Sequence, residues 1–153
     1  MARQIVIGCD DAACDLKAVL VETLEKMGIE FEDVGVVSSK DKTIYPQVAE
    51  RVANAIIASG DKKLGILLCG TGIGMCISAN KFPGIYAAVC HDSFSSERAK
   101  LSNNTNVICM GARVIEPELA KKNLIEWLSL EFKDGSSTPK VNHIKAIERK
   151  VMK

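Results

Sequence analysis

The sequence has few of the side chains that hold metal ions. Its two histidines, His91 and His143, lie far apart, and none of its six cysteines forms a C-x-x-C pair. A structural zinc site needs four such ligands at short, characteristic spacings. We therefore expect no metal in this protein.

A charge excess and a long apolar run are also missing. Lys and Arg number 20 against 19 Asp and Glu, for a formal net charge of +1, whereas a protein that tracks nucleic-acid phosphates carries a basic surplus. No apolar run approaches the roughly 20 residues that cross a bilayer. Neither a nucleic acid nor a membrane is an expected partner.

The six cysteines do not indicate a disulfide framework. No secretory leader precedes them, and a chain of 153 residues with 47% apolar and 25% charged residues can bury an ordinary core without covalent links. We expect reduced thiols, a cytoplasmic location and one domain over residues 1–153.

Short hydrophobic runs alternate with helical patterns along the chain. Residues 4–9 form a β-rich run, and Leu16, Leu20 and Leu24 then recur at helical spacing. The same alternation predicts strands at 30–36, 64–69, 85–90 and 106–110, and helices that begin near Pro46, Met75 and Pro117. Continuous apolar strands between helices are typical of an α/β, doubly wound parallel sheet of about five strands, with helices on both faces.

A polar break at residues 133–139 precedes a last amphipathic helix, predicted over 139–152. Val141, Ile144, Ile147 and Val151 share one face of it, with Lys and Glu on the other. Such a face needs a packing partner. The pattern leaves two options open, the chain's own sheet or a partner subunit.

Ligands of an open parallel sheet bind beyond the carboxyl ends of its strands. Three segments attract attention for this reason: Asp10 and Asp11 after the first strand, the glycine-rich residues 69–74 after the third, and residues 102–106 just before the fifth.

Gly70, Gly72 and Gly74 predict a loop whose backbone N–H groups turn inward at a helix N-terminus and receive an anion. The dinucleotide pattern G-x-G-x-x-G would need glycine at Met75, and the loop follows the third strand instead of the first. The loop therefore indicates an anion site and not a dinucleotide site.

Cys69 stands where this strand meets the loop. A free thiol has a pKa near 8.5, and a helix N-terminus lowers it toward neutrality. A nucleophilic role would need a histidine base, which the sequence does not place beside it. A basic role, in which the thiolate takes a proton from a carbon next to a carbonyl while the loop stabilises the enediolate, needs fewer missing parts. Thr71 adds a hydroxyl in the same turn.

These residues resemble the ribose-5-phosphate isomerase B and galactose-6-phosphate isomerase family along the whole chain. The matching segments are residues 7–10, 45–46, 69–75, 78–81, 103–107 and 111–114. The resemblance implies a Rossmann-like domain, dimeric or tetrameric, that interconverts aldose and ketose phosphates without a metal or cofactor.

The resemblance also implies roles for individual residues. Cys69 would move the proton between C1 and C2, and Thr71 would help to shift the hydroxyl proton. Asp10, Tyr45 and Asn103 would bind sugar hydroxyls. The expected substrate-binding set is completed by Asp11, Gly70, Gly72, Ile73, Gly74, Arg113 and Lys140.

Several positions depart from the family pattern. Ser102 replaces the histidine that opens the furanose ring, and a serine is a poor acid or base at neutral pH. Asp11 replaces a phosphate-binding histidine, and Ser136 and Lys140 replace two arginines near the C-terminus. Ile44 replaces an acid before Tyr45.

These departures leave three hypotheses. The first is an isomerase of ribose 5-phosphate. The second keeps the chemistry but changes the substrate to galactose 6-phosphate or to a tetrulose phosphate, because a tetrose phosphorylated on its fourth oxygen forms no furanose ring that Ser102 would have to open. The third is a catalytically silent sugar-phosphate-binding subunit.

Overall fold

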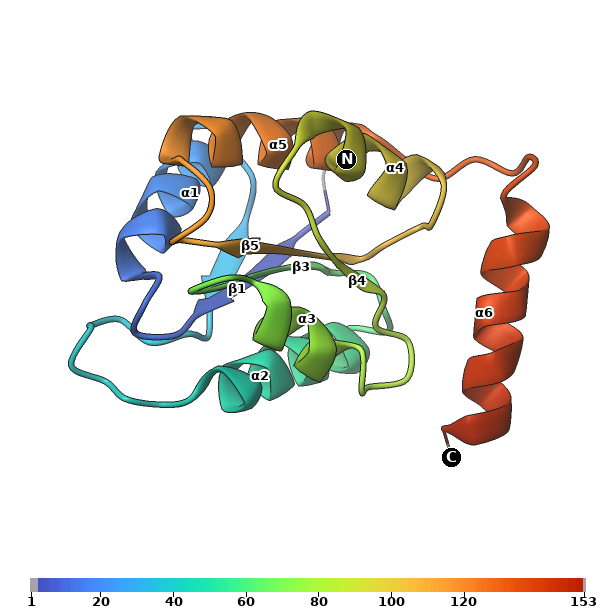
Figure 1. Ribbon diagram of the computed structural model, residues 1–153, viewed down its shortest axis with the longest axis horizontal. Helices are drawn as coiled ribbons and strands as arrows, with labels where there is room; N and C mark the ends of the chain where they lie inside the picture. Colours follow the sequence, from blue (N-terminus) through green and yellow to red (C-terminus); the bar gives the residue numbers. More distant parts are fainter. Residues whose placement is uncertain (1–2, 153) are drawn as a thin grey trace.

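The computed structural model describes residues 3–152, and over this range five strands and six helices alternate along the chain (Figure 1). The strands are β1 (Ile5–Cys9), β2 (Phe31–Asp33), β3 (Leu64–Cys69), β4 (Ala87–Val89) and β5 (Val107–Gly111). The helices are α1 (Cys14–Lys26), α2 (Tyr45–Ala58), α3 (Ile73–Ala79), α4 (Ser93–Leu101), α5 (Pro117–Ser129) and α6 (Thr138–Val151).

The strands form one parallel sheet in the order β2-β1-β3-β5-β4. Strands β1, β3 and β5 are buried along their whole length, which explains why their sequences are continuous apolar runs. The predicted α/β fold is confirmed. The two edge strands are shorter than predicted, since β2 covers only three residues of the run 30–36 and β4 only three of 85–90.

Helices cover both faces of the sheet. Helices α1, α4 and α5 lie on one face, and α2 and α3 lie on the other (Figure 1). Each presents an apolar stripe to the strands, as in α2, where Val48, Val52 and Ile56 are fully buried at helical spacing. Pro46 and Pro117 stand at the first turn of α2 and α5, where a missing N–H costs no hydrogen bond.

Trp127 of α5 belongs to the core, as expected from the sequence. It is fully buried, and its indole N–H donates to Thr105 Oγ1 at 3.0 Å. The Lys100 ammonium lies 4.1 Å from the ring centroid and donates to the Trp127 carbonyl at 3.0 Å. Burial lowers the pKa of Lys100 to about 8. This lysine therefore joins α4 to α5.

Helix α6 lies beside the sheet layers and not on them (Figure 1). Its carboxylate Glu148 accepts hydrogen bonds from the Gly84 N–H at 2.7 Å and the Tyr86 hydroxyl at 2.8 Å, ahead of β4. Val141 is buried, but Ile144, Ile147 and Val151 are 43%, 50% and 65% exposed. The apolar face of α6 is thus mostly uncovered by its own chain.

Candidate active site

The order of the strands places three loops together at one edge of the sheet. The strand order reverses between β1 and β3, which is where a crevice opens beyond the carboxyl ends of a doubly wound sheet. In the register of the sheet, Cys9 pairs with Leu68 and Cys69 pairs with Gly111. The segments that follow β1, β3 and β5 therefore converge on one point.

A cavity of about 440 Å³ lies at this point. Among the predicted site residues, eight charged, polar or glycine positions and Ile73 line it. They are Asp10, Asp11, Tyr45, Cys69, Gly70, Thr71, Ile73, Gly74 and Arg113, and Ala12 and Ile77 complete the wall. Gly72 contributes its backbone immediately behind this wall. The sequence thus predicted most of the lining, and it missed Ala12 and Ile77.

Cys69 lies at the floor of the cavity with 4% of its surface exposed. The Gly72 N–H donates to its sulfur at 3.1 Å. This contact requires the loop to turn back on itself, and Gly72 does so with a φ of +79°, which residues with a Cβ rarely adopt. An added Cβ at Gly72 would also lie 2.9 Å from the Met110 carbonyl carbon. The glycine therefore directs a backbone donor at the thiol.

Thr71 is exposed at the mouth of the loop, and its hydroxyl accepts the Ile73 N–H at 3.3 Å. The loop is tied to the end of β5, because Ala112 N–H donates to the Cys69 carbonyl at 2.8 Å and Arg113 N–H to the Gly70 carbonyl at 3.0 Å. These bonds bring the Arg113 side chain across Gly70, where an added Cβ would lie 2.9 Å from a guanidinium nitrogen. The Arg113 guanidinium therefore lies over the glycine-rich loop.

Asp10 and Tyr45 also line this cavity. The Asp10 carboxylate accepts the Ala12 N–H at 3.0 Å, and burial raises the pKa of Asp10 above its usual range. Tyr45 begins α2, and its ring lies against Gly74. A carboxyl group and a phenol suited to binding hydroxyl groups thus line the cavity together with the thiol.

His91 lies closer to this site than the sequence indicated. It lies two residues after the end of β4, and its Nε2 accepts the Gly111 N–H at 2.8 Å, at the end of β5 that leads to Arg113. The signal was present in the sequence, because a residue that follows a parallel strand lies at the ligand-binding edge. Asp92 beside it caps α4 by accepting the Ser95 N–H at 2.7 Å.

Acidification is expected to destabilise the fold through His91. Burial lowers the pKa of His91 from 6.5, and only the neutral ring accepts the Gly111 N–H. The unfolded chain therefore binds more protons, so stability is complete above about pH 6.5 and is lost as the pH falls below it. We expect a loss on the order of 1 kcal/mol, the net contribution of one hydrogen bond.

Chemical denaturation from pH 7.5 to 5 measures this loss. The variant His91→Gln should show a shallower dependence of unfolding free energy on pH. His143 is exposed on α6, so His143→Gln serves as the matched control and should follow the unmodified chain. Equal pH slopes for all three chains would contradict the role assigned to His91.

The structure does not bring Asn103 to this cavity. The segment 102–106 lies at the amino edge of the sheet, where the Gly65 N–H donates to the Asn106 carbonyl at the start of β3. Cys69 ends the same strand four residues after Gly65, about 13 Å away at roughly 3.3 Å per residue. The expectation that residues 102–106 share an edge with the glycine loop is wrong, because a segment that precedes a parallel strand enters from the opposite side.

Lys140 is also away from the cavity. It lies exposed in the first turn of α6, which stands beside the sheet (Figure 1). Within one chain, therefore, the cavity contains the thiol, the loop, Asp10, Tyr45 and Arg113, but it lacks two of the predicted substrate contacts.

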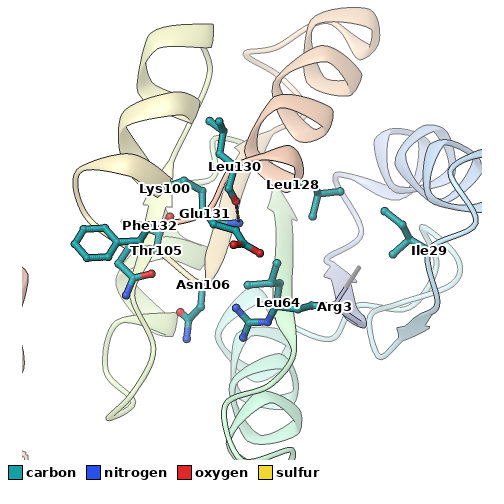
Figure 2. A pocket seen from close by; sticks show the side chains of 11 residues that line it. Arg3, Ile29, Leu64, Lys100, Thr105, Asn106, Leu128, Leu130, Glu131 and Phe132 are labelled. Carbon is teal, nitrogen blue, oxygen red and sulfur yellow. Dashed lines mark hydrogen bonds between the residues drawn. The ribbon is translucent and has the colours of Figure 1, made fainter. Parts of the chain in front are cut away.

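A second cavity, of about 310 Å³, lies at the amino edge of the sheet, and Figure 2 shows its lining. Its two cations are engaged by backbone carbonyls. Lys100 donates to the Leu130 carbonyl at 3.4 Å as well as to Trp127, and Arg3 donates to Asp61 at 2.8 Å and Lys62 at 2.7 Å. Both cations of this cavity are therefore occupied by the fold, and Glu131 is the remaining charged residue in its lining.

Two further features bear on the kind of site. Between residues 3 and 152, no three His, Cys, Asp or Glu side chains come together as metal ligands. None of the helices in this range combines the length and the hydropathy that crossing a bilayer requires.

Comparison with known proteins places the chain among sugar-phosphate enzymes. The family model for ribose/galactose isomerases matches residues 5–144. The D-erythrulose-4-phosphate isomerase of Pectobacterium atrosepticum is 51% identical over 140 residues, which cover 92% of this chain and 91% of the relative. Ribose-5-phosphate isomerase B of Escherichia coli is 41% identical over 148 residues, with 97% and 98% covered.

Solved structures agree with the sequence matches. The crystal structure of ribose-5-phosphate isomerase B from Mycoplasma genitalium with bound ribulose-5-phosphate superposes with a TM-score of 0.92 at 30% identity, covering 97% of each chain. The match therefore extends over the sheet, the glycine loop and the C-terminal helix together. This chain belongs to the ribose/galactose isomerase family.

Proposed function

We propose that this protein interconverts an aldose phosphate and a ketose phosphate through an enediolate, with ribose 5-phosphate and ribulose 5-phosphate as the principal pair. The observation that carries the proposal is the Cys69 sulfur at the floor of the cavity, 3.1 Å from the Gly72 N–H, beneath a loop that Arg113 covers. Relatives with ribose-5-phosphate isomerase B in their names support this choice of substrate.

The proposed reaction moves protons and needs no redox partner. The Cys69 thiolate takes the proton from C2 of the open-chain aldose, and the electron pair shifts through C1 to the carbonyl oxygen. The loop amides stabilise the resulting enediolate. Thr71 assists the transfer of the hydroxyl proton from O2 to O1, and the Cys69 thiol returns its proton to C1, which completes the ketose.

Substrate binding in this proposal uses Asp10, Tyr45 and Arg113. The Asp10 carboxylate accepts hydrogen bonds from sugar hydroxyls, and the Tyr45 phenol donates to them or accepts from them. The guanidinium of Arg113 faces the phosphate group of the substrate. A substrate held by these side chains keeps its C1 and C2 above the Cys69 sulfur. Orientation of this kind is a major source of rate acceleration, since it replaces a search in solution by a fixed geometry.

We also propose that two copies of the chain complete each site. Asn103 and Lys140 lie outside the cavity of their own chain, and the apolar face formed by Ile144, Ile147 and Val151 of α6 is uncovered. A two-fold dimer in which α6 packs on the second copy would bury this face and bring a second Asn103 to the glycine loop. The chain would then be a homodimer, or a tetramer built from such dimers.

A tetrulose phosphate is the second candidate substrate. Ser102 stands where a ring-opening histidine is expected, and an aldose phosphorylated on its fourth oxygen has no furanose ring to open. The 51% identical relative is named a D-erythrulose-4-phosphate isomerase, which favours the same alternative. Galactose 6-phosphate and a silent binding subunit remain as the further hypotheses.

An assay of the purified chain against tetrose, pentose and hexose phosphates tests these substrates. Turnover of ribose 5-phosphate above the others would support the principal pair, and turnover of the tetrose phosphate alone would replace it with the second candidate. A preference for galactose 6-phosphate would show that the protein is a hexose-phosphate isomerase. No turnover of any of them would refute an isomerase made of this chain alone.

The location proposed from the sequence also has structural support. All six cysteines are free thiols, and Cys9, Cys69, Cys90 and Cys109 are buried. Thiols that must remain reduced for a catalytic cysteine suit the reducing cytoplasm. We therefore retain a cytoplasmic location as part of the proposal.

Replacing Gly74 with alanine is expected to reduce turnover by moving Tyr45. The added Cβ would lie 2.3 Å from a ring carbon of Tyr45, so the ring must leave its place in the cavity wall. A displacement near 1 Å at a substrate-positioning group costs on the order of 100-fold in rate. Steady-state kinetics would record this loss, with circular dichroism to verify the fold.

Gly135→Ala is the matched control, because its added Cβ meets no atom within 4 Å. Its kinetics should equal those of the unmodified chain. Unchanged kinetics in Gly74→Ala would show that the ring of Tyr45 does not position the substrate.

A further inference from the structure

The wall of the candidate active site carries an unexpected charge for a site that receives a phosphate. Asp10 and Asp11 contribute two carboxyl groups, and Arg113 contributes one guanidinium. Asp11 is partly exposed to the cavity, at the position directly after the Asp10 that faces the loop. An unpaired carboxylate here would repel a phosphate dianion.

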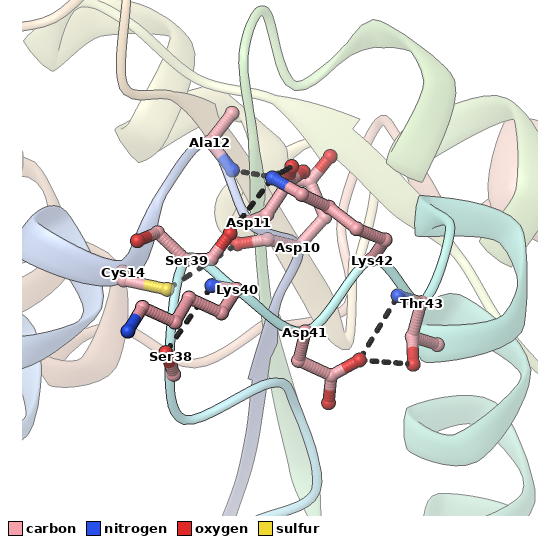
Figure 3. Close-up of polar contacts among 10 residues, drawn as sticks. All are labelled: Asp10, Asp11, Ala12, Cys14, Ser38, Ser39, Lys40, Asp41, Lys42 and Thr43. Carbon is pink, nitrogen blue, oxygen red and sulfur yellow. Dashed lines mark hydrogen bonds and ion pairs between the residues drawn. The ribbon is translucent and has the colours of Figure 1, made fainter.

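Lys42 removes this repulsion. Its ammonium lies 3.0 Å from Asp11 Oδ2 and donates to the Ser39 carbonyl at 2.8 Å, so it bridges the Asp11 turn and the loop before α2 (Figure 3). An ammonium has three N–H donors. Two are engaged by these oxygens, and one is available for a ligand oxygen.

The loop that carries Lys42 is held by its own hydrogen bonds. Asp41 accepts the Thr43 N–H at 3.0 Å and the Thr43 hydroxyl at 2.7 Å, and Asp41 N–H donates to the Ser38 carbonyl at 3.0 Å (Figure 3). These bonds fix the backbone on both sides of Lys42. The lysine is therefore directed to Asp11 by the loop itself.

The pair contributes little to folding stability. The Lys42 side chain is 73% exposed and that of Asp11 is 37% exposed, and ion pairs this open to water are weak. Asp11 lines the candidate active-site cavity, and this is what distinguishes the pair from the other surface pairs. A cation there would act on a ligand more than on the fold.

We propose that Lys42 is a substrate-specificity residue that donates to the phosphate group of the substrate, with Asp11 as the residue that positions it. This inference rests on the proposed function, because it assigns the phosphate end of the same sugar phosphate. Arg113 and Lys42 then face the anion from the glycine-loop side and the Asp11 side of the cavity. The reacting carbons remain over Cys69, so Lys42 acts on binding and not on proton transfer.

Substitution of Lys42 by methionine separates these effects. We expect Lys42→Met to raise the KM for the sugar phosphate and the dissociation constant for inorganic phosphate about tenfold each, the loss of one charge-assisted hydrogen bond, with kcat within about twofold. Lys40→Met is the matched control, since it removes the same charge from the same loop at an exposed side chain. It should leave all three constants unchanged.

A double variant decides whether Lys42 contacts the anion or only masks Asp11. If Lys42 donates to phosphate, Asp11→Asn/Lys42→Met will bind phosphate more weakly than Asp11→Asn alone. Equal affinities for these two variants would overturn the proposal, because they would show that Lys42 only neutralises Asp11. Equal effects of Lys42→Met and Lys40→Met would also overturn it, because they would show that any positive charge on this loop attracts phosphate equally.

The phosphate measurement keeps this inference separate from the proposed function. Calorimetric titration with inorganic phosphate needs no turnover. If the unmodified chain isomerises no sugar phosphate yet binds phosphate through Lys42, the proposed reaction fails and the Lys42 site stands. If the chain isomerises a sugar phosphate and Lys42→Met alters neither KM nor phosphate affinity, the site fails and the reaction stands.

Discussion

Replacement of Cys69 with alanine is expected to abolish isomerisation and to leave the fold in place. Cys69 is the residue proposed to carry the proton between the two carbons, and a positioned general base contributes about 100-fold to 10,000-fold to the rate. We expect a loss in kcat near the upper part of this range. Cys69→Ser should be equally impaired, because a hydroxyl is a far weaker base than a thiolate at neutral pH.

Exchange with solvent gives a direct measurement of this step. Isomerisation in D₂O places deuterium on the sugar wherever the base exchanges its proton, and proton NMR detects the exchange even when net turnover is slow. Cys69→Ala should incorporate none at the transferred position. Retention of full turnover or exchange in this variant would refute the role of Cys69.

Cys76→Ala serves as the matched thiol control. Cys76 is half-buried one turn into α3 and is not part of the cavity wall, although a hydrogen bond from Cys109 lowers its pKa to about 7. Cys69→Ala therefore still contains a thiol with a lowered pKa. Normal activity in Cys76→Ala together with an inactive Cys69→Ala would show that the base is the thiol at the cavity, and that another thiol with a lowered pKa cannot replace it.

Mixing two inactive variants is expected to restore activity. If the site combines Cys69 of one chain with Asn103 of another, Cys69→Ala and Asn103→Ala are each inactive alone. A mixed dimer then has one site with both residues intact and one with neither. Random reassociation makes half of the dimers mixed, so about a quarter of the unmodified activity should return.

The experiment requires that the two variants exchange partners. Mild denaturation and refolding of the mixture, followed by light scattering, would establish the dimer before the assay. Mixing Cys69→Ala with Thr71→Ala is the matched control, since both residues lie in one glycine loop and no mixed site contains both. Recovery in neither mixture, or a monomer in solution, would contradict a shared site.

The sequence indicated the fold because parallel sheets leave a strong local pattern. Strand β3 was predicted at its observed bounds, and α5 begins at the predicted Pro117. Edge strands were predicted too long, since β2 and β4 are only partly covered and their apolar runs extend beyond the hydrogen-bonded residues. Periodicity reports burial, and burial does not end where strand pairing ends.

The glycine-rich loop of the candidate site was also visible in the sequence. A cysteine at a strand end, followed by glycines at alternate positions, predicts a tight backbone turn. The structure has this turn at Gly72, which alone among Gly70, Gly72 and Gly74 adopts a positive φ. The neighbours of the loop were harder to predict. His91 was considered but not expected beside Cys69, although it follows a predicted strand. Lys42 gave no signal, because its proposed role depends on a loop that reaches back to Asp11.

The sequence by itself therefore determined the parallel α/β fold, the thiol and the anion loop, because each arises from residues close together in the chain. Only the tertiary structure decided which distant groups share the cavity. It joined Asp10, Tyr45 and Arg113 to Cys69 through strand order, and it separated Asn103 from them by the length of a strand. The physical reason is that all strands of a parallel sheet point one way, so whether a segment precedes or follows its strand decides the edge at which it lies.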